Sequence, residues 1–163
     1  MRHWGHVDPV PLGLIHVGPI VGGLLRAHAV AQKAGFPDFR QPIRMMVDTG
    51  AQRTLVHDDI ATKLGLVPIR FDNVVGVSGK PESYPVYLLG LEIGVSPRAA
   101  TPSAPASATV TFGAEILGMP SAAPDHQGLI GRDVLAHAKF YYDGLNGDFS
   151  IEFPRLFSTG TKP

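Results

Sequence analysis

An aspartate interrupts the most informative apolar stretch of the chain. In the segment MMVDTGAQRTLV, residues 45–56, a strand-like run leads straight into Asp48, and after a short polar loop the chain turns apolar again. A carboxylate between two such strands is at least partly buried, and an unpaired buried charge is costly. Asp48 therefore needs either a structural partner or a chemical use, and its flanking strands favour a sheet-rich fold.

The composition fits one compact domain. The chain has 163 residues, of which 44% are hydrophobic and 17% are charged, and this is enough to bury a substantial core. Lys and Arg number 14 and so do Asp and Glu, so no net charge favours nucleic acid or an anionic membrane as partner. The absence of cysteine excludes disulfides, thiol nucleophiles and Cys-ligated zinc.

The N-terminal region contains an uncharged stretch, residues 9–25, which proline and glycine interrupt. It is too short and broken for a membrane helix, which needs roughly 20 apolar residues. Asp8 lies where an export signal would carry positive charge, so we expect short glycine-rich strands and a cytoplasmic protein, with secretion or a periplasmic location left open.

Most of the chain has the pattern of strands and turns. We expect strands at 18–30 and 40–47, a hairpin over 71–91, a strand at 109–112 and a C-terminal hairpin over 139–153. Short helices are expected within 57–66, capped by Asp58 or Asp59, and at the end of 128–137. The expected organisation is a loose segment 1–17, a domain 18–155 with a flexible inserted loop at 96–108, and a tail 156–163.

The residue types of the Asp-Thr-Gly-Ala loop each suit a tight loop for a physical reason. Gly50 allows a backbone approach that a side chain would prevent, and the Thr49 hydroxyl can tie the loop down. Alone, a short motif of this kind recurs by chance, and Asp48 could simply cap a turn. Here GLIGRDVL follows about eighty residues later, with a glycine-containing hairpin between the two.

Four segments, taken in order, resemble the retropepsin-like aspartic proteases, and their cellular and bacterial members in particular. VGPIVGGLL resembles the first core strand, and MMVDTGAQRTLV resembles the catalytic strand and loop. VVGVSGKPESYPVYLLGLEI resembles the flap hairpin, and GLIGRDVL resembles the segment leading into the C-terminal helix. The resemblance implies a mostly β fold, a closed β-barrel with a flap hairpin and short helices, assembled as a homodimer.

The resemblance also implies an activity. Each chain carries one DTG motif, so Asp48 from two chains would form one catalytic dyad in an aspartic endopeptidase. Two close carboxylates share a proton, so that one can activate water while the other protonates the scissile carbonyl. The implied partners are a second copy of the chain and a peptide or protein substrate, and no cofactor is required.

The other site residues are implied by position in the family's motifs. They comprise the loop support Thr49, Gly50 and Ala51, the substrate-binding flap Gly76, Val77, Ser78 and Gly79, and the structural segment Ile130, Gly131 and Arg132.

Two positions depart from the retroviral pattern. Retroviral members often place an acidic residue after the alanine, where it pairs with the arginine of the Gly-Arg segment, but this chain has Gln52 and then Arg53. Arg132 must therefore find another partner. Asp133 is expected to cap the helix that follows it.

Other readings remain open at this point. The chain could be a non-catalytic dimerisation or peptide-binding module that retains the fold, or an enzyme that first removes an N-terminal segment. The apolar residues around Asp48 suggest apolar side chains beside the scissile bond. The seven histidines show no H-E-x-x-H or other tight ligand spacing, so no metal site is expected.

Overall fold

The computed structural model of the chain describes residues 2–4, 17–76, 79–95, 108–120 and 125–153. Its strands are β1 (Arg2–Trp4), β2 (Ile20–Ala27), β3 (Arg40–Val47), β4 (Leu55–His57), β5 (Arg70–Val75), β6 (Pro81–Val95), β7 (Ala108–Met119), β8 (Gly128–Ile130), β9 (Lys139–Asp143) and β10 (Asp148–Glu152). Its helices are α2 (Ala29–Lys33), α3 (Asp58–Lys63) and α4 (Arg132–Leu135).

Six of the strands form a closed barrel. They follow one another in the order β2-β3-β8-β4-β7-β6, and β6 pairs back with β2 to close the ring. The pairs β3–β8 and β4–β7 are parallel and the other barrel pairs are antiparallel, so the barrel is mixed. The predicted mostly β fold with a closed barrel and short helices is confirmed.

Alternation along β3 shows why the sequence forms this wall. Ile43, Met45 and Val47 are buried, whereas Arg40 and Arg44 are exposed, as the two-residue period of a strand requires. The buried side chains join one apolar cluster with residues of the other barrel strands. The core therefore fills the barrel and fixes the register of the strand that ends at Asp48.

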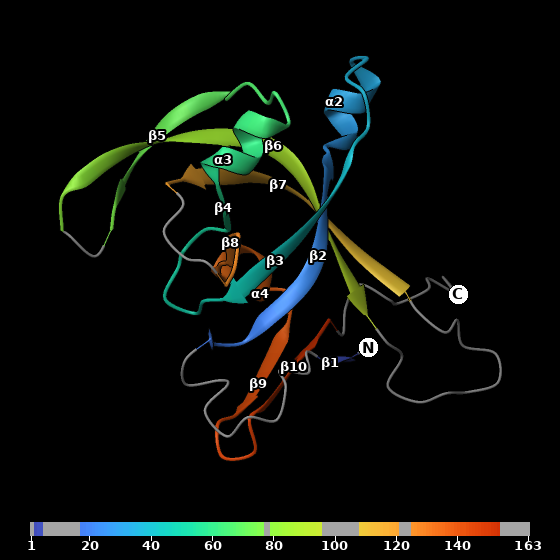
Figure 1. Cartoon of the computed structure of the whole chain (residues 1–163), viewed down its shortest axis with the longest axis vertical. Coiled ribbons are helices and arrows are strands. Elements are labelled where there is room, and N and C mark those ends of the chain that lie inside the picture. The colour runs from blue at the N-terminus through green and yellow to red at the C-terminus, as the bar shows by residue number, and fades with distance from the viewer. Residues whose placement is uncertain (1, 5–16, 77–78, 96–107, 121–124, 154–163) are drawn as a thin grey trace, which may run out of the picture.

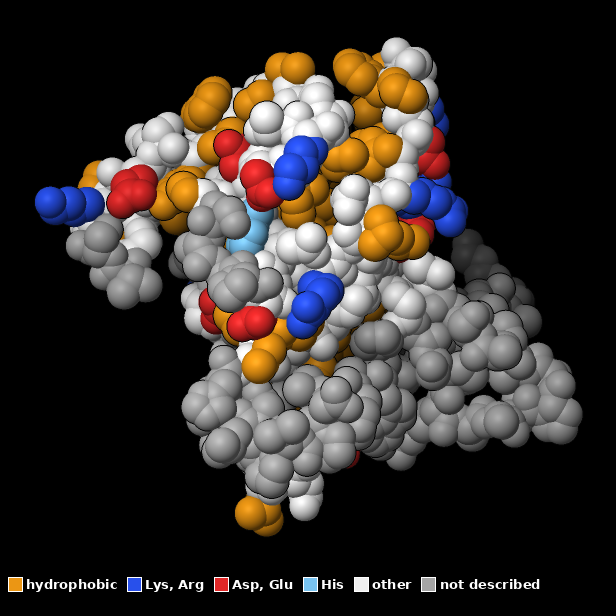
Figure 2. Space-filling view, in the orientation of Figure 1, with side chains coloured by type: hydrophobic (Ala, Val, Ile, Leu, Met, Phe, Trp, Pro, Cys, Tyr) orange, Lys and Arg blue, Asp and Glu red, His pale blue; other side chains and the backbone are white. Residues whose placement is uncertain are grey.

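The hairpin expected over 71–91 is present as β5 and β6, and it projects from the barrel as a curved arm (Figure 1). The first part of β6, up to Val86, pairs with β5, and the rest pairs with β7. Strand β5 has β6 as its only partner in the described sheet. Figure 2 shows hydrophobic side chains at the surface of the upper part of the molecule. Phe71 and Val75 of β5 are each more than half exposed.

The C-terminal hairpin predicted over 139–153 is also present, as β9 and β10 (Figure 1). Strand β10 pairs on its other side with β1. Phe149, Ile151 and Phe153 are fully buried and belong to the same core cluster as the barrel strands. This small sheet is therefore packed onto the barrel core.

Two local predictions were wrong. The strand expected to run through Val30 ends at Ala27, because the His28 ring accepts a hydrogen bond from the Val30 N–H at 3.2 Å and begins helix α2. Helix α3 is preceded by His57, with Asp58 and Asp59 inside its first turn, so neither aspartate is the N-cap.

Several predicted boundaries fall partly outside the described residues. These are the inserted loop, of which only Ala108 is described, most of segment 1–17, and the tail 156–163. In the part of the chain that the structure describes, no helix has the length and apolarity to cross a membrane.

Candidate active site

Asp48 is the first residue after β3, at the point where this strand leaves the barrel. The N–H of Val47 donates to the Pro19 carbonyl at 2.9 Å, and the N–H of Asp48 donates to the Ile130 carbonyl at 3.0 Å. Ile130 is the last residue of β8 and is almost completely buried. The backbone of Asp48 is therefore held between two neighbouring segments.

The Asp48 carboxylate is half-buried and turned back onto its own loop. Its Oδ1 accepts hydrogen bonds from the N–H groups of Gly50, at 2.8 Å, and Ala51, at 3.3 Å. A Cβ at Gly50 would lie 3.1 Å from that same oxygen, so a side chain there would require the carboxylate to shift by a few tenths of an ångström. Among the described residues, every hydrogen bond to the carboxylate ends on Oδ1, so Oδ2 keeps its lone pairs for another group.

A second loop locks onto the first. The N–H of Arg132 donates to the Ala51 carbonyl at 2.9 Å, and the N–H of Asp133 donates to the Gln52 carbonyl at 3.3 Å. At Gly131 a Cβ would lie 2.4 Å from the carbonyl carbon of Arg53, so no side chain fits without separating the two backbones. We call the two interlocked segments, residues 48–54 and 131–133, the floor.

Thr54 and Asp133 clamp the floor together. The buried Thr54 donates its N–H to Asp133 Oδ2 at 2.8 Å and its hydroxyl to Asp133 Oδ1 at 2.7 Å. The same hydroxyl accepts the Gly131 N–H at 3.1 Å. The prediction that Asp133 caps α4 was wrong, because the N-cap is Gly131. Asp133 lies in the first turn, where its carboxylate accepts the Val134 N–H at 2.9 Å and also bonds Thr54, 79 positions away.

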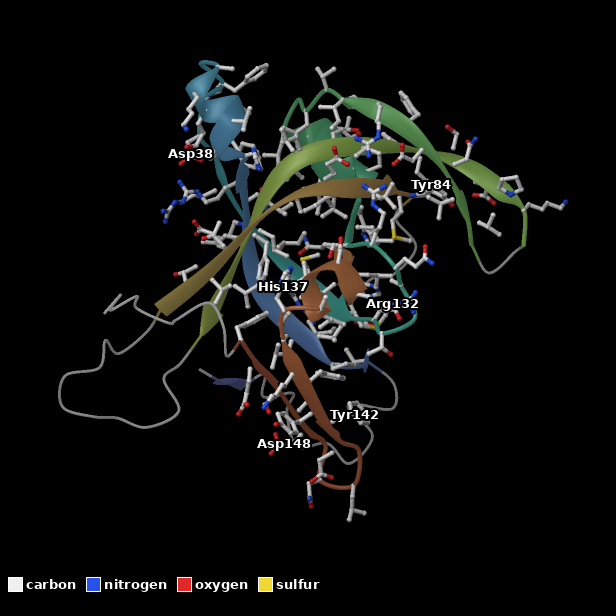
Figure 3. The ribbon with its side chains drawn as sticks, turned by 180° about the vertical axis from the view of Figure 1, so that it is seen from behind. Asp38, Tyr84, Arg132, His137, Tyr142 and Asp148 are labelled. Atoms are coloured by element: carbon white, nitrogen blue, oxygen red, sulfur yellow. The ribbon has the colours of Figure 1, made fainter. Side chains whose placement is uncertain are left out.

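Arg132, which lacks the acidic partner of the retroviral pattern, bonds a backbone oxygen. Its Nη1 donates to the backbone carbonyl of Thr49 at 3.3 Å, and the side chain remains exposed. Figure 3 places Arg132 beside the connection between β3 and β4. A backbone oxygen of the DTG loop thus takes the place of the acidic partner.

The expected substrate-binding residues at the end of the arm are only partly described. The N–H of Gly79 donates to the Gly76 carbonyl at 3.0 Å in a tight turn, and Gly79 has a φ of +70°, which favours glycine. Val77 and Ser78 lie outside the described residues. Within the described residues, no hydrogen bond joins Gly76 or Gly79 to residues 48–51.

The arm is joined to the floor at its base instead, by a residue that sequence reasoning left without a role. Arg53 Nη1 bonds Asp72 Oδ2 at 2.6 Å, and Arg53 Nη2 donates to the Glu115 backbone carbonyl at 3.0 Å. Hydrogen bonds from Arg70 and then Arg53 hold the pKa of Asp72 below its ordinary value. The available signal was the cation Arg53, one position beyond Gln52, which stands where the retroviral pattern often has an acid.

Other titratable groups support the barrel rather than the Asp48 loop. The rings of His57 and His126 lie 5.8 Å apart, and burial, followed for His57 by the nearby His126, lowers the pKa of both. Burial and a hydrogen bond to Asp58 raise the pKa of Tyr87 to about 12. Among the described residues, no three His, Asp or Glu side chains are grouped to hold a metal ion.

Two surface hollows lie elsewhere. One of about 480 Å³ is lined by Arg53 and Arg70, by residues of β7 that include Glu115, by residues of α4, and by His137 just after α4. The other, of about 630 Å³, lies at the β9–β10 hairpin near Tyr142. Asp48 lines neither of these two hollows.

A mixed six-stranded barrel that carries a loop-held Asp-Thr-Gly-Ala turn against a Gly-Arg-Asp segment defines the class of retropepsin-like aspartyl proteases. The model of the family described as "gag-polyprotein putative aspartyl protease" matches residues 40–137, more than half of the chain. The chain belongs to this family, and membership indicates peptidase activity. No curated protein matches the chain.

Proposed function

We propose that the protein is an aspartic endopeptidase whose active site forms when the Asp48 loops of two chains meet. The observation that carries the proposal is the Asp48 carboxylate, with Oδ1 oriented by two backbone N–H groups and no described donor on Oδ2. A carboxylate fixed in this way can present its second oxygen to a water or to an identical carboxylate. The chain holds one DTG motif, so the second Asp48 comes from another copy.

In the proposed reaction the two carboxylates share one proton, because two like charges in contact cannot both ionise at low cost. The ionised Asp48 takes a proton from a water, whose oxygen forms a bond to the scissile carbonyl carbon. The protonated Asp48 donates its proton to the carbonyl oxygen. The tetrahedral intermediate then breaks its C–N bond: the leaving nitrogen takes the proton that the first Asp48 removed from water, and a hydroxyl of the intermediate returns a proton to the second Asp48 as the new carboxyl group forms, so the dyad again holds one proton.

The substrate in this proposal is an extended peptide lying between the floor and the β5–β6 arm, which acts as the flap. Gly76 and Gly79 give the end of the arm the freedom that closure over a peptide requires. Thr49, Gly50 and Ala51 support the loop, and Ile130, Gly131 and Arg132 hold it from behind. We expect apolar side chains beside the scissile bond, and cleavage profiling that found charged residues on both sides would refute this.

One observation favours a second candidate. The hydrogen bond from the Gly50 N–H to Asp48 Oδ1 is also what an aspartate makes when it only stabilises a turn. On this reading the protein is a dimerisation or peptide-binding module that keeps the fold without catalysis, and Asp48 is structural.

Peptide-library cleavage between pH 4 and 8 separates the two candidates. The proposal expects cleavage by the wild type, inhibition by a statine-type compound, and a loss of at least about 10²-fold in Asp48→Asn. Asp59→Asn is the matched control, because Asp59 is an exposed carboxylate paired with Lys63 on α3. A dimer by light scattering that cleaves no peptide would support the binding module.

A further inference from the structure

The β5–β6 arm has one structural weakness, and charged side chains compensate for it. In the described sheet, β5 pairs with β6 along one edge and with no other strand. Phe71 and Val75 on β5 are 65% and 63% exposed, so apolar burial holds this strand only weakly. Apart from β6, which continues into the barrel wall, the described contacts that hold β5 in place come from charged side chains.

Four side chains at the base of the arm form a closed ring of ion pairs, which we call the charge ring: Arg53, Arg70, Asp72 and Glu115. Arg53 Nη1 lies 2.6 Å from Asp72 Oδ2, and Arg70 Nε lies 2.8 Å from Asp72 Oδ1. Arg70 Nη2 lies 2.5 Å from Glu115 Oε2, and Arg53 Nη2 closes the ring at 3.8 Å from that same oxygen.

The charge ring connects three separate parts of the chain. Arg70 and Asp72 belong to β5, Glu115 belongs to β7 in the barrel wall, and Arg53 belongs to the floor. The nearest floor contacts of Arg53 are rigid, because the adjacent Thr54 is clamped by Asp133. One end of the ring is therefore anchored, and the other end is on the element that has few other contacts.

We propose that Arg53 is a positioning residue: through the charge ring it sets the resting orientation of the arm above the Asp48 loop. The two cations and two anions balance, so each carboxylate meets an opposite charge without excess repulsion. The side chains keep between 27% and 45% exposure, so the attraction is moderate and screened by salt. Such a contact holds a hairpin in one orientation and still allows it to open.

The inference predicts a specific kinetic effect, and this part rests on the proposed function. Without Arg53, the arm spends less time in the orientation that receives a peptide, so substrate binding weakens. The dyad itself is untouched, because Arg53 does not contact Asp48. KM should therefore rise roughly threefold to fivefold, whereas kcat should stay within about twofold.

Hydrogen exchange of the backbone amides tests the inference without any activity. In Arg53→Gln, amides of residues 70–75 and 79–86 should exchange roughly threefold to fivefold faster, and those of β3 and β8 should not change. Arg53→Lys keeps the charge and should restore most of the protection. Wild-type protein in 1 M salt, where the Debye length is about 3 Å, should resemble Arg53→Gln in this hairpin.

Lys63→Gln is the matched control, because it removes the cation of an exposed ion pair on α3 and should leave the hairpin unchanged. If Arg53→Gln does not fold, Asp72→Asn breaks the ring from the arm and gives the same readout. Unchanged hairpin exchange in the variants and in high salt would overturn the inference even if the enzyme cleaves peptides. Faster hairpin exchange in the variants, together with no peptide cleavage by the wild type, would support the positioning role of Arg53 and refute the proposed function.

Discussion

The floor and the arm are joined through Arg53 but are held by different forces. Backbone hydrogen bonds, a buried Thr54 hydroxyl and a glycine contact with no space for a Cβ hold the floor. Partly exposed ion pairs hold the arm. Close packing and buried hydrogen bonds fix the atoms of the floor to within tenths of an ångström, whereas surface ion pairs only favour one orientation of the arm. The chain thus combines a closely packed base for its carboxylate with a hairpin that partly exposed ion pairs tie to that base.

Gly131→Ala should produce the largest effect, because it attacks the floor at its tightest contact. The new Cβ would lie 2.4 Å from backbone carbon and 2.5 Å from backbone oxygen of Arg53, so the two loops must separate. We expect a loss of about 3 kcal/mol in the free energy of unfolding, measured by denaturant titration.

Gly22→Ala is the control for that change. Gly22 is an exposed strand glycine with no atom within 4 Å of the added Cβ, and the change should be neutral or stabilising by up to about 1 kcal/mol. Equal losses in the two variants would mean that the floor is no tighter than an ordinary strand.

Thr54→Val should have the next largest effect, since it keeps the shape and removes the hydroxyl. The Gly131 N–H is left without its buried acceptor, and Asp133 loses one donor, for an expected loss of about 2 kcal/mol. Thr62→Val removes an exposed hydroxyl on α3 and should change stability by less than about 0.5 kcal/mol. A neutral Thr54→Val would show that the clamp is dispensable.

Two histidines of the barrel, outside both regions, should make stability depend on pH. The pKa values of His57 and His126 are lowered in the folded chain, so the unfolded chain binds protons first as the pH falls below the ordinary value of 6.5. The stability that the two neutral histidines contribute is fully present above pH 6.5, and it is lost as the pH falls through their lowered pKa values. Each histidine adds a slope of at most about 1.4 kcal/mol per pH unit.

Denaturation between pH 5 and 8 measures that slope, and His126→Gln should reduce it. The charged neighbours to account for are Asp59 beside His57, and Asp125 and Arg44 beside His126. A slope that survives His126→Gln unchanged would place the acid sensitivity elsewhere in the chain.

Asp72→Asn should have the smallest effect on overall stability, with a fall in Tm below about 3 °C at pH 7, because its ion pairs are partly exposed. Hydrogen bonds from Arg70 and Arg53 lower the pKa of Asp72, so its contribution is present above the ordinary value of 3.8 and is lost as the pH falls through the lowered pKa. The difference in Tm between variant and wild type should therefore be constant from pH 5 to 8 and shrink below about pH 4. A large fall at pH 7 would mean that the arm is part of the folding core.

Local pattern predicted the strands and the order of the motifs, because alternation in a strand such as Arg40–Val47 is a property of neighbouring residues. It missed α2, which begins at a histidine cap rather than at one of the common capping residues. Local pattern also predicted Asp133 as the N-cap of α4, whereas the N-cap is Gly131 and the Asp133 carboxylate bonds Thr54. The partners of Arg53 and Arg132 could not be predicted, because long-range contacts decide them.

The interlocking of the floor has a consequence for how the protein is made. The segment that completes the Asp48 loop lies some eighty residues downstream, so the loop cannot be finished early in folding. At ribosomal speeds of about 5–20 residues per second, several seconds pass between synthesis of Asp48 and synthesis of Gly131. During that interval a nascent chain has the Asp-Thr-Gly-Ala motif but lacks the downstream segment whose N–H groups bond the backbone of the loop. The active site proposed above therefore cannot assemble until this segment has been made and the barrel has closed.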